Sequence, residues 1–91
     1  MKNMNPKIEY KIKIGENILS WRRLKGIKQE DLANKIGLSP SALSNIENGI
    51  STPNIKRLED ISNALEIEVS QLLKNPQEFF SFNNSIKTNG S

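Results

Sequence analysis

The chain has 91 residues, the size of one small domain, and contains neither cysteine nor histidine. These absences exclude disulfides, a zinc-finger ligand set and a histidine base, so a metal site would need a cluster of carboxylates, and we expect no enzyme, cofactor or metal. No apolar run reaches the length of a bilayer span and no signal peptide is visible, so we expect a cytoplasmic protein.

The net charge of +3 is unevenly distributed along the chain. Residues 1–28 carry eight basic and two acidic side chains, a balance of +6, whereas residues 29–91 carry five basic and eight acidic ones, a balance of −3. A basic part of this kind can face nucleic-acid phosphates, and it can equally be an ordinary solvated surface. Charge by itself therefore does not decide between these interpretations.

The first thirteen residues show an alternating pattern. Ile8, Tyr10, Ile12 and Ile14 are separated by charged side chains, a period of two that predicts a short strand or an extended arm over residues 1–13. Such a segment can reach along DNA as a basic arm, add a strand to a dimer partner, or be a frayed terminus. The sequence leaves these alternatives open.

A helix is predicted next, over residues 15–25. Ile14, Ile18 and Trp21 fall on one face, and Gly26 stands where a glycine commonly ends a helix. We place Trp21 in the core because its large apolar ring stabilises a domain this small.

Two short helices joined by a sharp turn are predicted over residues 29–49. The first carries apolar residues at helical spacing and stops at Gly37, a residue that readily adopts the left-handed conformation. Ser39 is a good N-cap for the second helix, Pro40 suits its first turn, and Gly49 follows its end. Two helices of this length have the dimensions of a helix-turn-helix, whose second helix can lie in the major groove of DNA.

Two more helices follow. Pro53 suits the first turn of a helix capped by Thr52, and one apolar stripe runs along this helix at spacings of three and four residues. After an interruption at residues 66–68, a last short helix over residues 69–73 closes the core before Pro76. Residues 14–74 are therefore the predicted domain, with five helices.

The tail, residues 75–91, differs in composition from the domain. Three aromatic residues stand close together and are followed by Asn, Ser, Thr and Gly, a segment too polar to fold by itself. The aromatic side chains either pack on the domain or meet another chain. We expect a dimer contact or a protein partner here, because exposed aromatic clusters often mark interfaces, and the residues concerned are Phe79, Phe80 and Phe82.

The stretch KGIKQEDLANKIGLSPSALSNIENGISTPNIKRLEDISNALEI combines several spaced features. A glutamine opens its second helix, a glycine occupies the turn, and Ile-Glu-Asn-Gly ends its third helix. In these features residues 14–74 resemble the Cro and phage-repressor type of helix-turn-helix protein, often called the XRE family. The resemblance implies an all-α, five-helix lambda-repressor-like fold from a bacterium or phage, with the N-terminal arm and C-terminal tail outside it.

The resemblance implies that Gln29 and Asn48 contact DNA phosphates on either side of the groove. An amide at a helix N-terminus lies beside free backbone N–H groups and partial positive charge, which suits an anion. Each amide can instead cap or bond the turn beside it. The family usually has Ser or Thr before the glutamine, whereas this chain has Lys28, which cannot accept the N-cap bonds. Lys28 instead joins the candidate backbone contacts, which also include Arg23, Lys56 and Arg57.

The second helix of the motif is the expected reading helix. Asn45 is its best candidate reader, because a carboxamide can bond bidentately to adenine, while Ala42 can touch a thymine methyl group. No arginine or lysine is available there for guanine, so we expect contacts weighted towards A·T base pairs. Leu43 and Ile46 point inward, and the outward-facing candidates for base contacts are Pro40, Ser41, Ala42, Ser44 and Asn45.

The resemblance also implies a buried structural ion pair between Arg22 and Glu47. Such a pair would tie the first helix to the end of the reading helix and would orient the two helices. Arg22 lies beside the inward stripe and Glu47 follows the core residue Ile46, which supports this interpretation. The alternative is that both side chains are solvated.

The function that the resemblance implies is sequence-specific binding of double-stranded DNA by a transcriptional regulator. Because one reading helix covers only a few base pairs, we expect a repressor that binds a palindromic operator as a homodimer through helix 39–48. The alternatives are an antitoxin or a restriction-modification controller protein that binds DNA and a protein partner. An enzyme would need a lone serine or a carboxylate pair in a domain with little room for a pocket.

Overall fold

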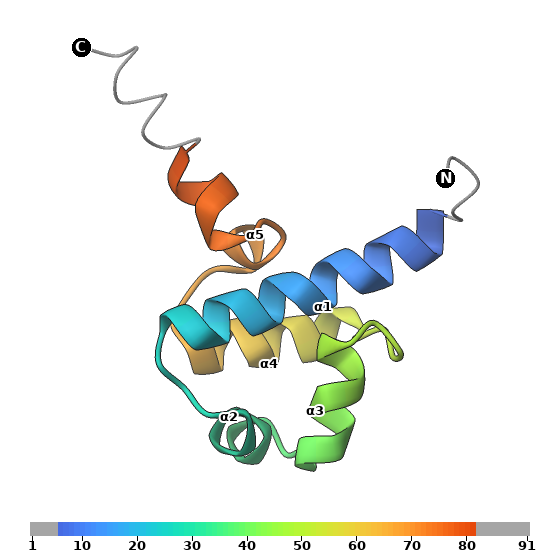
Figure 1. Cartoon of the computed structure of the whole chain (residues 1–91). Coiled ribbons are helices and arrows are strands. Elements are labelled where there is room, and N and C mark those ends of the chain that lie inside the picture. The colour runs from blue at the N-terminus through green and yellow to red at the C-terminus, as the bar shows by residue number, and fades with distance from the viewer. Residues whose placement is uncertain (1–5, 82–91) are drawn as a thin grey trace.

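The computed structural model describes residues 6–81, and all the regular structure among them is helical. In Figure 1, α1 crosses the molecule with α2 and α3 below it and with α5 and residues 76–81 above it. The predicted all-α fold is confirmed. The helices are α1 (Pro6–Leu24), α2 (Gln29–Lys35), α3 (Pro40–Glu47), α4 (Ile55–Leu65) and α5 (Val69–Leu72), with residues 76–81 as a further helical segment.

A single apolar core joins these helices. Trp21 is 1% exposed, and its indole N–H donates to the carbonyl oxygens of Gln71 at 3.1 Å and Lys74 at 2.7 Å. The predicted core position of Trp21 is thus confirmed, and its ring ties α1 to α5 and to Lys74, two residues beyond the end of α5. The buried apolar side chains are Ile14, Ile18, Trp21, Leu32, Ala33, Ile36, Leu43, Ile46, Leu58, Ile61, Leu65, Ile67 and Leu72.

The helices α1 and α3 lie in close backbone contact at Gly15. A Cβ atom at this position would lie against the carbonyl oxygen of Ile46 and 2.7 Å from the carbonyl oxygen of Glu47. Glycine therefore allows the middle of α1 to rest on the backbone at the end of α3. This contact helps to set the position of α3 relative to the core.

Residues 6–13 differ from the prediction, because they form the first turns of α1. An arm or short strand is therefore wrong for this part of residues 1–13, and residues 1–5 lie outside the described residues. Ile8, Tyr10 and Ile12 remain 48%, 43% and 37% exposed, so the alternating pattern does not mark a buried strand face. A helix that has nucleated at residues 14–24 extends readily, and proline is tolerated in its first turn.

The start of α4 also differs from the prediction. The sequence favours Thr52 as the N-cap, but Asn54 takes this role, and its side-chain oxygen accepts from the backbone N–H of Arg57 at 2.8 Å. Pro53 lies before the cap and is buried. Asparagine caps helices at least as well as threonine, and the later start leaves the proline ring free to pack.

The aromatic tail begins as a helical segment that folds back on the core. The Phe79 ring lies 5.8 Å from the Trp21 ring in an edge-to-face arrangement, and Phe79 packs against the core. Of the two alternatives, intramolecular packing is the one that the structure shows for Phe79, because its half-buried ring lies against Trp21 of the same chain, and the dimer contact stays a prediction. Phe80 remains 48% exposed with its ring 6.0 Å from Trp21, and Phe82 lies outside the described residues.

Candidate nucleic-acid interface

The two helices of the motif are held together at a short turn. Gly37 has a φ of +73°, and the backbone N–H of Leu38 donates to the carbonyl oxygen of Ala33 at 2.8 Å, which closes the end of α2. The Ser39 hydroxyl then accepts from the backbone N–H of Ala42 at 3.1 Å, and Pro40 occupies the first turn of α3. The capping that the sequence predicts for α3 is confirmed.

The predicted base contacts lie on the outward side of α3. Leu43, Ile46 and Glu47 are buried on the inner side of this helix. By contrast, Ser41 and Asn45 are exposed and stand four residues apart, one helical turn along the same face. Pro40 is also exposed, whereas Ala42 and Ser44 are half-buried at the edges of this face.

A shallow hollow connects this face to the start of α2. Gln29 borders the hollow from α2, and the remaining lining comes from the outer side of α3. The structure therefore brings a predicted phosphate contact next to predicted base contacts from the other helix. The side chains from α3 are Pro40, Ser41, Ser44 and Asn45.

The two predicted phosphate-binding amides have partners within the protein. The Gln29 side-chain N–H donates to Glu47 Oε1 at 2.9 Å, and the Asn48 side-chain N–H donates to the Ser44 hydroxyl at 3.2 Å. Asn48 is exposed at the C-cap of α3, so its amide bonds within its own helix end. Gln29 is half-buried and bonds across to a different helix.

Arg22 and Glu47 form an ion pair in the interior. Arg22 Nε lies 2.7 Å from Glu47 Oε2, and a second nitrogen, Nη2, lies 3.1 Å from Glu47 Oε1. Their side chains are 11% and 3% exposed, and Arg22 also donates to the carbonyl oxygen of Ile27 at 3.0 Å. Two parallel bonds of this kind fix the mutual orientation of the guanidinium and carboxylate planes.

The predicted basic contacts to the DNA backbone have different surroundings. Lys28 is the exposed N-cap residue of α2 and makes no side-chain cap bond, and Arg23 is also exposed. Lys56 Nζ pairs with Asp60 at 2.8 Å along the surface of α4. Arg57 donates to the carbonyl oxygen of Ile36 at 2.7 Å, so it links α4 to the end of α2 instead of extending into solvent.

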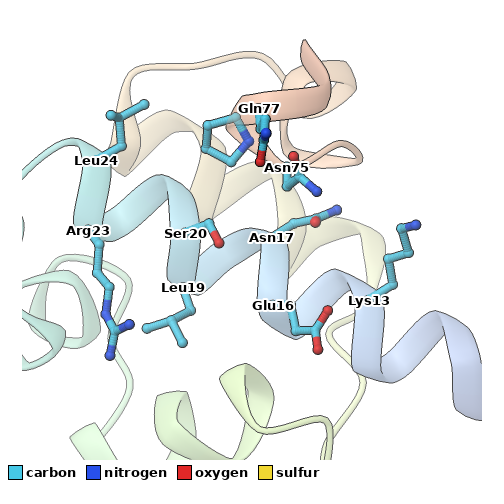
Figure 2. Close-up of a pocket in the computed structure, with 10 residues that line it drawn as sticks. Lys13, Glu16, Asn17, Leu19, Ser20, Arg23, Leu24, Asn75 and Gln77 are labelled. Atoms are coloured by element: carbon cyan, nitrogen blue, oxygen red, sulfur yellow. The ribbon is translucent and has the colours of Figure 1, made fainter. Parts of the chain in front are cut away.

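A larger hollow lies between α1 and residues 75–77, and it does not include the outer face of α3. Figure 2 shows Asn17 and Ser20 on the side of α1 that faces Asn75 and Gln77, whereas Arg23 points away from them. Asn17 is 2% exposed, and its side-chain nitrogen has no hydrogen-bond partner among residues 6–81. This hollow thus contains one buried, unsatisfied donor.

The part of the chain that the structure describes lacks two other features, a metal-binding cluster and a membrane-spanning helix. Residues 6–81 hold no group of three or more acidic side chains placed to bind a metal ion. None of the helices in this range has the length and apolar character needed to cross a membrane.

The comparison with known protein families agrees with this geometry. A family model described as helix-turn-helix matches residues 18–72, from the middle of α1 to the end of α5. The chain belongs to this helix-turn-helix family. Residues 6–17, which include the exposed first turns of α1, lie outside the match.

Several bacterial regulators are similar to this helix-turn-helix protein. The transcriptional regulator SinR of Bacillus licheniformis is 39% identical over 66 residues, which cover 71% of the chain and 60% of SinR. The uncharacterized regulator YazB of Bacillus subtilis is 36% identical over 58 residues, which cover 64% of the chain and 84% of YazB. The chain thus spans about 60% of the length of SinR but most of YazB.

Solved structures show the same fold. SinR, solved in complex with DNA, is 40% identical in sequence to this chain, and the two structures align with a TM-score of 0.61. The alignment covers 67% of this chain and 98% of the SinR chain. The restriction-modification controller protein C.AhdI from Aeromonas hydrophila is 28% identical, has a TM-score of 0.71, and covers 75% of the chain and 99% of C.AhdI. The predicted membership of the Cro and phage-repressor type is confirmed.

Two features of the interface were not predicted from the sequence. The bond from Gln29 to Glu47 joins residues 18 positions apart, and the bond from Arg57 to Ile36 joins residues 21 positions apart. A polar residue at the inner end of α3 and an arginine at the start of α4 are the only sequence signals. Neither residue type indicates which residue it will bond, because the partner is brought close only when the helices pack together.

Proposed function

We propose that this protein is a transcriptional repressor that binds a palindromic DNA operator as a homodimer, with α3 and its N-cap, residues 39–48, in the major groove. The observation that carries this proposal is the outward face of α3, where Ser41 and Asn45 are exposed beside Gln29 of α2. SinR, which is 40% identical in the aligned region, was solved in complex with DNA, and that likeness supports the same use of this surface. Such a repressor acts in the cytoplasm, where bacterial DNA is found.

Base recognition is assigned to the exposed polar side chains of α3. Asn45 can donate and accept in the plane of an adenine, and Ser41 can pair with either base type. Ala42 offers a methyl group to thymine, and no cationic side chain of α3 is available to read guanine. The proposed half-site is therefore weighted towards A·T pairs under α3.

Contacts to the DNA backbone are assigned to residues around this face. Gln29 and Asn48 each keep a second amide N–H after their internal bonds, because a carboxamide carries two such donors. Lys28 and Arg23 are exposed and can approach phosphates from the end of α1 and the start of α2. Lys56 would have to break its ion pair with Asp60 before it could contact a phosphate.

A homodimer is part of this proposal because α3 is only eight residues long. One helix of this length reads a few base pairs, and two copies on half-sites about one helical turn apart supply useful affinity and specificity. The controller-protein alternative retains a structural likeness to C.AhdI. The antitoxin alternative depended on a free aromatic tail, and the packing of Phe79 on the core weakens that support.

Selection from a pool of random-sequence duplexes at two salt concentrations tests the proposal. We expect enrichment of an A·T-rich palindrome with steep salt dependence, and loss of enrichment with a Gln29→Ala/Asn48→Ala variant. A promoter that carries the enriched site should be repressed in cells that make the protein. Guanine at the position facing Asn45 would contradict the assigned reader, and no binding at low salt would contradict DNA binding altogether.

A further inference from the structure

Glu47 lies where three helices meet. It belongs to the last turn of α3, it is paired with Arg22 of α1, and it accepts from the side chain of Gln29 at the first position of α2. We propose that Glu47 is a positioning residue, which holds the Gln29 amide in the orientation that contacts the DNA backbone. This inference rests on the proposed function and adds a residue that itself need not touch DNA.

The chemistry of the contact determines which way the amide of Gln29 faces. A carboxylate only accepts hydrogen bonds, so the group of Gln29 that lies 2.9 Å from Glu47 Oε1 has to be its NH₂ group. One of the two amide protons is therefore committed to Glu47. The second proton and the amide oxygen remain on the other side, where Gln29 borders the hollow beside α3.

The carboxylate is itself held in place. Arg22 donates to both oxygens of Glu47 at 2.7 and 3.1 Å, and the two side chains are 11% and 3% exposed. A buried, bidentate pair cannot rotate without losing charge-assisted hydrogen bonds. The guanidinium also neutralises the charge of Glu47, which would otherwise repel a phosphate close to Gln29.

This arrangement lowers the entropic cost of binding DNA. A free glutamine side chain has many rotamers, and ordering such a side chain at an interface opposes association. The bond to Glu47 restricts the rotamers of Gln29 before DNA binds, so less freedom is lost on binding. Asn48 provides a contrast, since its amide donates only to Ser44 of the same helix and lies on the exposed surface.

The test compares the effect of Gln29→Ala in two backgrounds. One background is the natural chain, and the other carries Arg22→Met/Glu47→Leu, which removes the whole ion pair and leaves no buried charge behind. Affinity is measured by fluorescence anisotropy on a mixed-sequence 24-base-pair duplex at low salt, since a backbone contact acts on any sequence. Thermal unfolding of every variant verifies that it is folded.

We expect Gln29→Ala to weaken binding about tenfold in the natural background and less than about threefold in the replaced background. Gln77→Ala, an exposed glutamine away from α3, is the matched control and should leave the affinity unchanged. Equal losses from Gln29→Ala in both backgrounds would overturn the positioning role. Failure of the natural chain to bind the duplex would instead contradict the proposed function.

A spectroscopic measurement on the natural chain keeps the inference testable if the replaced background does not fold. In ¹⁵N-resolved spectra, one side-chain amide proton of Gln29 should exchange slowly with water, and its chemical shift should not change when the duplex is added. The other proton should shift on addition of DNA. Two fast-exchanging Gln29 protons, like those of the exposed Gln77, would overturn the inference.

Discussion

The buried Arg22 guanidinium contacts the carboxylate of Glu47 and the carbonyl oxygen of Ile27, so it joins α1 to α3 and to the loop before α2. We predict that Arg22→Ala lowers the free energy of unfolding by about 3–5 kcal/mol, because it leaves the Glu47 charge buried without its main partner. Urea unfolding measures this loss. Lys56→Ala removes a pair whose lysine side chain is 76% exposed, and it should change stability by less than about 1 kcal/mol. Equal, small effects of both substitutions would contradict the structural role of Arg22.

At Gly15, a single added Cβ atom would disturb the packing of α1 against α3. Alanine normally stabilises the interior of a helix relative to glycine. Here the added Cβ would meet the backbone carbonyls of Ile46 and Glu47, which cannot move away as a flexible side chain can. We therefore predict that Gly15→Ala destabilises the protein by about 1–3 kcal/mol. Glu16→Ala, at the exposed neighbouring position of the same helix, is the control, and a rise in melting temperature for Gly15→Ala would contradict the close contact.

At Asn17, in contrast to Gly15, we expect a substitution to stabilise the protein. Its side-chain nitrogen is buried without a partner among the described residues, and such a donor carries a desolvation cost of about 1–3 kcal/mol. We predict that Asn17→Leu, which keeps the branch at Cγ, removes the polar atoms and can place its larger side chain against the hollow that Asn17 lines, raises the melting temperature by several degrees in a calorimetric scan. A lower melting temperature would mean that the amide has a favourable partner in solution.

At the scale of the elements, the helices of the motif follow from local signals. Gly37, Ser39 and Pro40 act through their own backbone and nearest neighbours, so their roles can be read from the sequence. The first residues of α1 and α4 could not be predicted in this way. Residues 6–13 continue the helix of residues 14–24, since adding a residue to a helix costs less than starting one, and α4 is capped by Asn54 instead of Thr52.

In the candidate site, too, local features could be predicted from the sequence, whereas contacts between distant residues could not. The outward positions of α3 follow from its helical period, and the Arg22–Glu47 pairing follows from the family resemblance. The bond from Glu47 to Gln29 depends on how three helices are packed, so no local pattern indicates it. The packing of Phe79 on Trp21 likewise joins distant parts of the chain.

The helical segment at residues 76–81 provides a prediction at this scale. Phe79→Ala should lower the free energy of unfolding by about 2–4 kcal/mol, because the ring covers Trp21 and packs on the core. The fluorescence of Trp21 should shift to longer wavelength as water reaches the indole. Phe80→Ala should cost less, since the Phe80 ring is 48% exposed. If Phe80→Ala were the more damaging substitution, the described packing of this segment would be wrong.

At the scale of the whole molecule, α1 separates two sides of the structure. The proposed reading surface belongs to α2 and α3 below α1, whereas α5 and residues 76–81 lie above it (Figure 1). Gly15 and Arg22 place α3 against α1, so the orientation of the proposed reading helix depends on the core. The exposed first turns of α1 lie outside the residues that the family model matches.

The most direct measurement of the central claim is an NMR titration of the ¹⁵N-labelled protein with the duplex enriched by selection. We predict that the backbone signals of the outward side of α3 and the start of α2 shift, with Ser41, Asn45 and Gln29 among them. The signals of residues 76–81, on the other side of α1, should stay in place. Shifts confined to α5 and residues 76–81, or no shift of the α3 signals at saturating duplex, would contradict DNA reading by this helix.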